Sequence, residues 1–101
     1  MANRQAVKNP DLWGWQSDHV VETEALTPRG AQRSVQAVYL DGERVGYLVS
    51  RADSRGRREW DYTTRDATKV EERYGLTYAS PSRQHAAVFL VEHVLRERAA
   101  R

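Results

Sequence analysis

The sequence predicts an α+β fold, with an antiparallel β-meander of three to four strands, a long C-terminal α-helix packed on one sheet face and a short helix before it. Two observations support this prediction. Through the middle of the chain, apolar residues recur every second position, while toward the C-terminus they recur at helical spacing. An Asp-Gly dipeptide at 41–42 also separates two alternating runs, which is typical of a β-hairpin.

The chain of 101 residues has the length of one domain. Apolar residues make up 40% and charged residues 30%, a balance typical of a globular protein with a modest core. Residues 1–12 are polar and contain Pro10, so we expect a flexible N-terminal tail there. Residues 13–101 form the predicted single domain.

The first two predicted strands cover residues 19–26 and 34–40, where β-branched and alternating residues dominate. Between them, residues 27–33 contain a proline and a glycine and are expected to form a loop. The Asp-Gly turn then predicts a hairpin in which Leu40 lies opposite Glu43. The same register would place Val38 opposite Val45.

The returning strand is expected over residues 44–51, and a further strand over residues 59–64. On the last strand Trp60 and Tyr62 share one face. With Val45, Tyr47 and Val49 of the neighbouring strand, they are expected to form the sheet side of the core beneath the helix. The second sheet face is then expected to stay open, as antiparallel sheets allow.

Two helices are expected at the C-terminal side. Residues 66–75 offer Asp66 as an N-cap and Gly75 as a stop for a short helix. In the long helix that follows, Ser80 would be the N-cap and Pro81 the first helical residue. Its apolar stripe comprises Ala87, Leu90, Val91, Val94 and Leu95, widened by Ala86 and Phe89.

The charge composition is only weakly basic, with a formal net charge of +2. Of the 16 cationic residues, however, only Lys8 and Lys69 are lysines. Arginine gives planar, bidentate contacts to phosphate, although an Arg-rich genome would produce the same bias. The absence of cysteine fits a reducing compartment, and the sequence contains neither an apolar run long enough to span a membrane nor a signal-peptide pattern. We therefore expect a cytoplasmic protein that does not bind membranes.

An arginine cluster is the strongest candidate site. Arg51, Arg55, Arg57 and Arg58 lie within eight residues around one predicted loop, and Arg44 lies on a strand that leads toward it. Such a loop can contact nucleic-acid phosphates. Alternatively, it is a solvated hairpin turn or a contact for an acidic protein.

A tryptophan pair is the second candidate. Trp13 and Trp15 flank Gly14, and in an extended segment both rings would point to one face. They could stack on bases or anchor a protein interface. The alternative is that at least one ring covers the core of this small domain.

No catalytic, metal or cofactor site is predicted. His85 and His93 lie eight residues apart, which is not the spacing of paired metal ligands, and we expect His93 to be partly buried and His85 exposed. Ser82 lies three residues before His85, but no nucleophile-elbow motif accompanies them. The chain also lacks GxGxxG and P-loop motifs. We therefore predict a protein that is not an enzyme.

Two functions remain open from the sequence. The first is a small non-enzymatic nucleic-acid-binding protein, with DNA favoured, that uses the arginine-rich loop. The order of elements resembles, in topology alone, the small DNA-binding domains of some integrases. The second is a protein-interaction module, an adaptor or inhibitor, that docks a partner through the open sheet face and its Trp and Tyr anchors. A homodimer is compatible with either.

Overall fold

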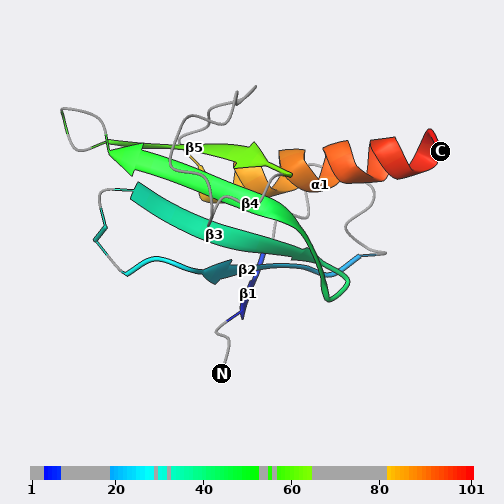
Figure 1. Ribbon diagram of the computed structural model, residues 1–101, viewed down its shortest axis with the longest axis horizontal. Helices are drawn as coiled ribbons and strands as arrows, with labels where there is room; N and C mark the ends of the chain where they lie inside the picture. Colours follow the sequence, from blue (N-terminus) through cyan, green and yellow to red (C-terminus); the bar gives the residue numbers. More distant parts are fainter. Residues whose placement is uncertain are drawn as a thin grey trace.

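The computed structural model describes residues 4–7, 19–28, 30–31, 33–52, 55, 57–64 and 82–101, with only the backbone described at 51 and 52. Five strands form one antiparallel sheet in the order β1-β2-β3-β4-β5, and one helix follows (Figure 1). The elements are β1 (Arg4–Ala6), β2 (Val21–Ala25), β3 (Arg33–Leu40), β4 (Glu43–Ala52), β5 (Arg58–Thr63) and α1 (Arg83–Ala99). The α+β class and the antiparallel meander are therefore confirmed.

The sheet has one strand more than expected. Arg4–Ala6, within the segment expected to be a flexible tail, pairs with β2 so that Gln5 lies opposite Thr23. Its three side chains are exposed, so the sequence shows no apolar alternation that would reveal the strand. The expected short helix at 66–75 lies outside the described residues.

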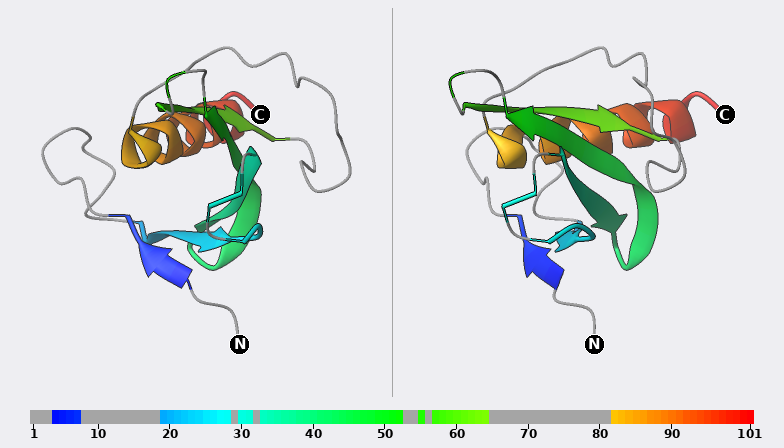
Figure 2. Two further views of the ribbon diagram at one scale, coloured as in Figure 1. Left: turned by 90° about the vertical axis from the view of Figure 1, so that its left-hand side faces the viewer. Right: turned by 60° about the vertical axis from the view of Figure 1, so that its left-hand side comes forward.

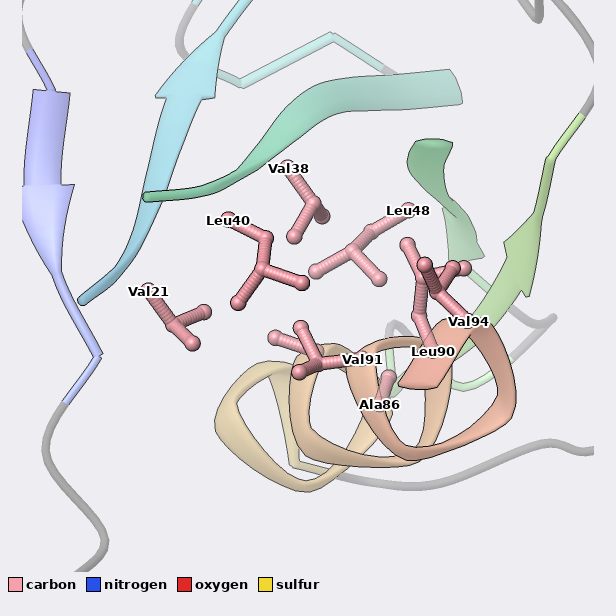
Figure 3. Close-up of a cluster of buried hydrophobic side chains, with 9 residues drawn as sticks. Val21, Val38, Leu40, Leu48, Ala86, Leu90, Val91 and Val94 are labelled. Carbon is pink, nitrogen blue, oxygen red and sulfur yellow. The ribbon is translucent and has the colours of Figure 1, made fainter. Parts of the chain in front are cut away.

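The sheet curls, and α1 lies on its concave side against β4 and β5 (Figure 2). We call this side the inner face and the opposite side the outer face. Leu40, Leu48 and Leu90 are almost completely buried in the core between the inner face and the helix (Figure 3). The core also contains Val21, Val38, Ala86, Ala87, Val91 and Val94, with Val45, Trp60 and Tyr62 packed against it.

The Asp-Gly hairpin forms as expected, with positive φ angles at Asp41 (52°) and Gly42 (85°) and with Leu40 opposite Glu43. Beyond the turn the expected register is wrong. The pairing shifts between Val38 and Tyr39, so Val38 lies opposite Gly46. Val45, which was expected opposite Val38, is the extra residue of a β-bulge.

The bulge reverses which residues of β4 face the helix. Leu48 and Ser50 take the inner face, whereas Tyr47 and Val49 join an outer-face cluster and do not lie under the helix as expected. This register places Gly46 beneath the helix, at a position that has no room for a side chain. A Cβ atom there would lie 2.6 Å from the Thr63 carbonyl oxygen and 2.8 Å from Leu90 Cδ2, so the helix packs where the strand has no side chain.

The outer face is not open at its centre, contrary to the expectation. Val35, Ala37 and Tyr39 of β3 are at most 9% exposed, as are Tyr47 and Val49 of β4. Their alternation with the inner-face residues makes β3 apolar on both sides, which is the pattern of a central strand.

The helix begins later than expected. Ser82, in an extended conformation, is the N-cap, and its Oγ accepts a hydrogen bond of 3.3 Å from the His85 amide. The expected cap residues Ser80 and Pro81 lie outside the described residues. The Ser82 hydroxyl therefore acts as the cap of the helix start. His93 is half-buried near the Tyr62 ring and His85 is exposed, as expected.

Candidate nucleic-acid interface and inner cavity

The predicted arginine site is divided between two ends of the sheet. Arg44 lies beside the β3–β4 hairpin, whereas Arg51 lies seven residues further along β4. At the usual rise per residue of a strand, roughly 20 Å separates the two positions. Arg44 therefore does not belong to the same surface as the arginines of the β4–β5 turn.

The end of the sheet that carries Arg33, Arg51, Arg55, Arg57 and Arg58 is called the turn end. Arg55 and Arg57 are exposed in the β4–β5 turn. The register also places Arg33 directly opposite Arg51, with Glu59 opposite Arg51 on its other side. Three strands thus bring two arginines and one glutamate into one row across the sheet, next to a turn that bears two further arginines.

Arg33 is not among the predicted site residues. Pro28 and Gly30 precede it and favour a loop, but it is the first residue of β3. Only the register shows that it lies opposite Arg51, and that register depends on the bulge at Val45.

Arg58 has a different role from Arg55 and Arg57. Its side chain is half-buried and donates hydrogen bonds to Ser34 Oγ (3.0 Å) and to the Ala31 carbonyl oxygen. These bonds tie the start of β5 to the start of β3 across the sheet. We therefore assign Arg58 to the structure of the turn end rather than to its contact surface.

The opposite end of the sheet, which we call the hairpin end, comprises residues 19–20, 41–45 and the C-terminal turn of α1. Here the charges are matched. Asp41 Oδ2 lies 2.7 Å from His19 Nδ1, and Arg98 lies 3.5 Å from Glu43. Arg44 shares a shallow hollow of about 370 Å³ with Glu43, Glu97, Arg98 and Arg101.

Asp41 fixes the hairpin to the chain before β2. Its Oδ1 accepts the Val20 amide at 2.8 Å, and its own amide donates to the Val20 carbonyl at 2.8 Å. The hydrogen bond from His19, followed by that from Val20, holds the pKa of Asp41 below its usual value of 3.8. This carboxylate therefore has a structural role.

A second concavity lies on the inner face beyond the part that α1 covers. It has a volume of about 610 Å³. Hydroxyl and amide side chains, one tryptophan and one arginine dominate its described walls: Gln5, Thr23, Ala25, Thr27, Pro28, Gly30, Ser34, Gln36, Trp60 and Arg83. The sequence alone does not reveal this cavity, because its walls come from four strands, the loop between β2 and β3, and the start of α1.

The second predicted site, Trp13 and Trp15, lies outside the described residues. Among the residues described, no cluster of three or more His, Asp or Glu side chains could hold a metal ion. The described helix is neither long nor apolar enough to cross a membrane.

Comparison with known proteins finds no matching family, no matching curated protein and no matching solved structure. Function is therefore inferred from the chain's own geometry.

Proposed function

We propose that this protein is a non-enzymatic, cytoplasmic nucleic-acid-binding protein that contacts DNA phosphates with its turn end. One observation carries the proposal: Arg33 lies opposite Arg51 beside a turn in which Arg55 and Arg57 are exposed. Arginine is the residue best suited to bidentate contacts with phosphate oxygens, so arginine positions gathered at one end of a sheet suit a nucleic-acid backbone.

The shape of the turn end also suits a nucleic-acid groove. β4 pairs with the edge strand β5, and the turn between these two strands carries Arg55 and Arg57 at the end of the sheet (Figure 1). Guanidinium groups on such a turn can contact the phosphates that border a groove of DNA. The proposed contact residues are Arg33, Arg51, Arg55 and Arg57.

The alternative, a protein-interaction module docking through the outer face, has less support. The aromatic residues described at the centre of that face, Tyr39 and Tyr47, are at most 9% exposed. Tyr39 is further engaged, because the Arg4 guanidinium lies 3.7 Å from its ring centroid and its hydroxyl donates to Glu24. These two rings are not exposed anchors.

The experiment is a fluorescence-anisotropy titration of a labelled mixed-sequence DNA duplex at low salt. We compare the wild type with R55A/R57A and with R44A/R101A, a control that removes the same charge from the hairpin end. Removal of two phosphate-binding guanidinium groups from the turn end should weaken binding by about tenfold, while the control changes it far less. Equal weakening by both variants, or no binding by the wild type at low salt, would overturn the proposal.

A further inference from the structure

The inner face changes character along the strands. Beneath α1 it is apolar, with Val38, Leu40 and Leu48. Toward the turn end the same face carries Thr23, Ser34, Gln36 and Ser50. Thr23 and Ser50 are each only 2% exposed, so polar groups replace apolar ones at buried positions. Burying such groups weakens a fold unless they find partners. Thr23, Ser34 and Gln36 line the inner cavity, and Ser50 lies next to it.

Arg83 is the one cationic residue among the described residues that line this cavity. As the first residue of α1, it donates to Gln5 Oε1 at 3.5 Å and to Gln36 Oε1 at 3.4 Å. Both partners are neutral amides held at the outer limit of hydrogen-bond distance. None of the described residues that line the cavity is acidic, and the first turn of α1 contains no acidic residue either. The partial positive charge of the helix N-terminus therefore adds to that of Arg83.

Several side chains that line the cavity already accept a hydrogen bond within the protein and still have an N–H or O–H group to donate. The two glutamine carbonyl oxygens accept from Arg83, so each side chain presents its NH₂ group. Thr27 Oγ1 accepts from the Val35 amide (3.1 Å), and its hydroxyl hydrogen remains to be donated.

Two serines extend this pattern. Ser34 Oγ accepts from Arg58, which leaves its hydroxyl hydrogen to donate. Ser50 Oγ is buried and has no hydrogen-bond partner. Its Cα lies opposite those of Ser34 and Trp60, both of which line the cavity. A buried hydroxyl without a partner next to a donor-lined cavity is a second sign that an acceptor-rich group belongs there.

We propose that the inner cavity binds a phosphomonoester. Its phosphoryl oxygens accept hydrogen bonds from Arg83 and the neighbouring donors, and its organic body lies against Trp60 and Pro28. A phosphoryl group suits a donor-lined cationic site, because it offers several acceptor oxygens and carries negative charge. At about 610 Å³ the cavity lies in the range of small-molecule sites, so it accommodates an organic body as well as the phosphoryl group.

The test uses adenosine 5′-monophosphate and, as the matched probe without a phosphoryl group, adenosine. Binding is followed through the Trp60 indole N–H resonance, which is assigned with a Trp60→Phe variant. We expect saturable shifts with the monophosphate and, at the same concentrations, none with adenosine. Equal binding of the two probes, or no binding of the monophosphate at millimolar concentration, would overturn the proposal.

Substitution of the guanidinium provides the second arm. Arg83→Gln should weaken monophosphate binding by about tenfold or more, because charge-assisted hydrogen bonds are removed. Arg98→Gln removes the same charge from the other end of the same helix and should leave binding unchanged. Arg83→Lys should recover part of the affinity by restoring the charge without the planar fork. Unchanged binding in a folded Arg83→Gln protein would contradict the proposal.

A competition arm identifies the source of the phosphomonoester. A 5′-phosphorylated single-stranded oligonucleotide is compared with its 5′-hydroxyl counterpart as competitor of the monophosphate. Stronger competition by the phosphorylated strand supports binding of a nucleic-acid 5′ end, and equal competition supports binding of a free small phosphomonoester. The R55A/R57A variant should bind the monophosphate normally, so failure of the cavity and failure of the turn-end proposal are distinguishable.

Discussion

The two ends of the sheet differ in how their charged and polar residues are arranged. At the hairpin end, Asp41 meets His19 and Arg98 meets Glu43, so the charges are matched and the geometry holds the fold. At the turn end, Arg33 lies opposite Arg51 and the inner face carries polar groups around a cavity. The number of arginines in a segment therefore does not locate a binding surface. Placement relative to the sheet distinguishes a structural arginine from a candidate contact.

We therefore expect substitutions near the hairpin end to lower the free energy of unfolding. Substitutions of the exposed arginines at the turn end should instead weaken DNA binding. The largest effect is expected at Gly46. Gly46→Ala should lower the free energy of unfolding by about 3 kcal/mol, because the new Cβ meets the Thr63 carbonyl and Leu90. Urea denaturation followed by circular dichroism measures this loss.

The control for that experiment is Gly42→Asn. Gly42 faces open space in the hairpin, and asparagine tolerates positive φ better than most residues, so a loss of about 1 kcal/mol or less is expected. If Gly46→Ala proved no more costly than Gly42→Asn, the close approach of α1 to β4 would be refuted.

Within the turn end, Arg58 should behave unlike its neighbour Arg57. Arg58→Ala should lower the free energy of unfolding by about 1.5 kcal/mol, since it removes the bonds to Ser34 and to the Ala31 carbonyl. Arg57→Ala, at an exposed position, should change stability by less than about 0.5 kcal/mol. Thermal and urea melts of the two variants check this, and equal losses would contradict the division of roles.

Two serines that lie opposite each other on β3 and β4, Ser34 and Ser50, should differ in their contribution to stability. Ser50→Ala removes a buried hydroxyl without a partner and should leave stability unchanged or raise it by up to about 1 kcal/mol. Ser34→Ala removes the acceptor of Arg58 and should lower stability by about 1 kcal/mol. The measurement is the urea midpoint of each variant. A clear loss in Ser50→Ala would show that its hydroxyl is engaged.

The smallest effect is expected at Asp41. Because hydrogen bonds from His19 and Val20 lower its pKa in the folded protein, its ionised form adds stability above pH 3.8. That contribution is lost as the pH falls below 3.8 through the folded-state pKa. Asp41→Asn keeps a residue that tolerates positive φ and should lower the urea midpoint slightly at about pH 7. The difference from the wild type should vanish well below pH 3.8, and a difference independent of pH would contradict this account.

Much of the fold is local enough to be predicted from the sequence. The Asp-Gly turn defines the hairpin and the pairing of Leu40 with Glu43, and the apolar stripe defines α1. The β-bulge is not local in this sense. It arises because Leu90, from the far end of the chain, packs where Gly46 lacks a side chain, and this packing inverts the faces of Tyr47 and Val49.

The candidate sites were less predictable for the same reason. Proximity in sequence grouped Arg55 and Arg57, which lie in one turn, with Arg44, which lies near the other end of β4. Arg33 and Arg83 gained their significance only from register and packing: one lies opposite Arg51, and the other reaches across to Gln5 and Gln36.

The most direct test of the turn-end surface is the slope of the DNA affinity against salt concentration on logarithmic scales. R55A/R57A should reduce the steepness of the wild-type slope by about two units, because each phosphate that is no longer neutralised means about one counterion fewer released on binding. R44A/R101A, which removes the same charge from the hairpin end, should retain the wild-type slope. Equal slopes for the wild type and R55A/R57A would contradict the account.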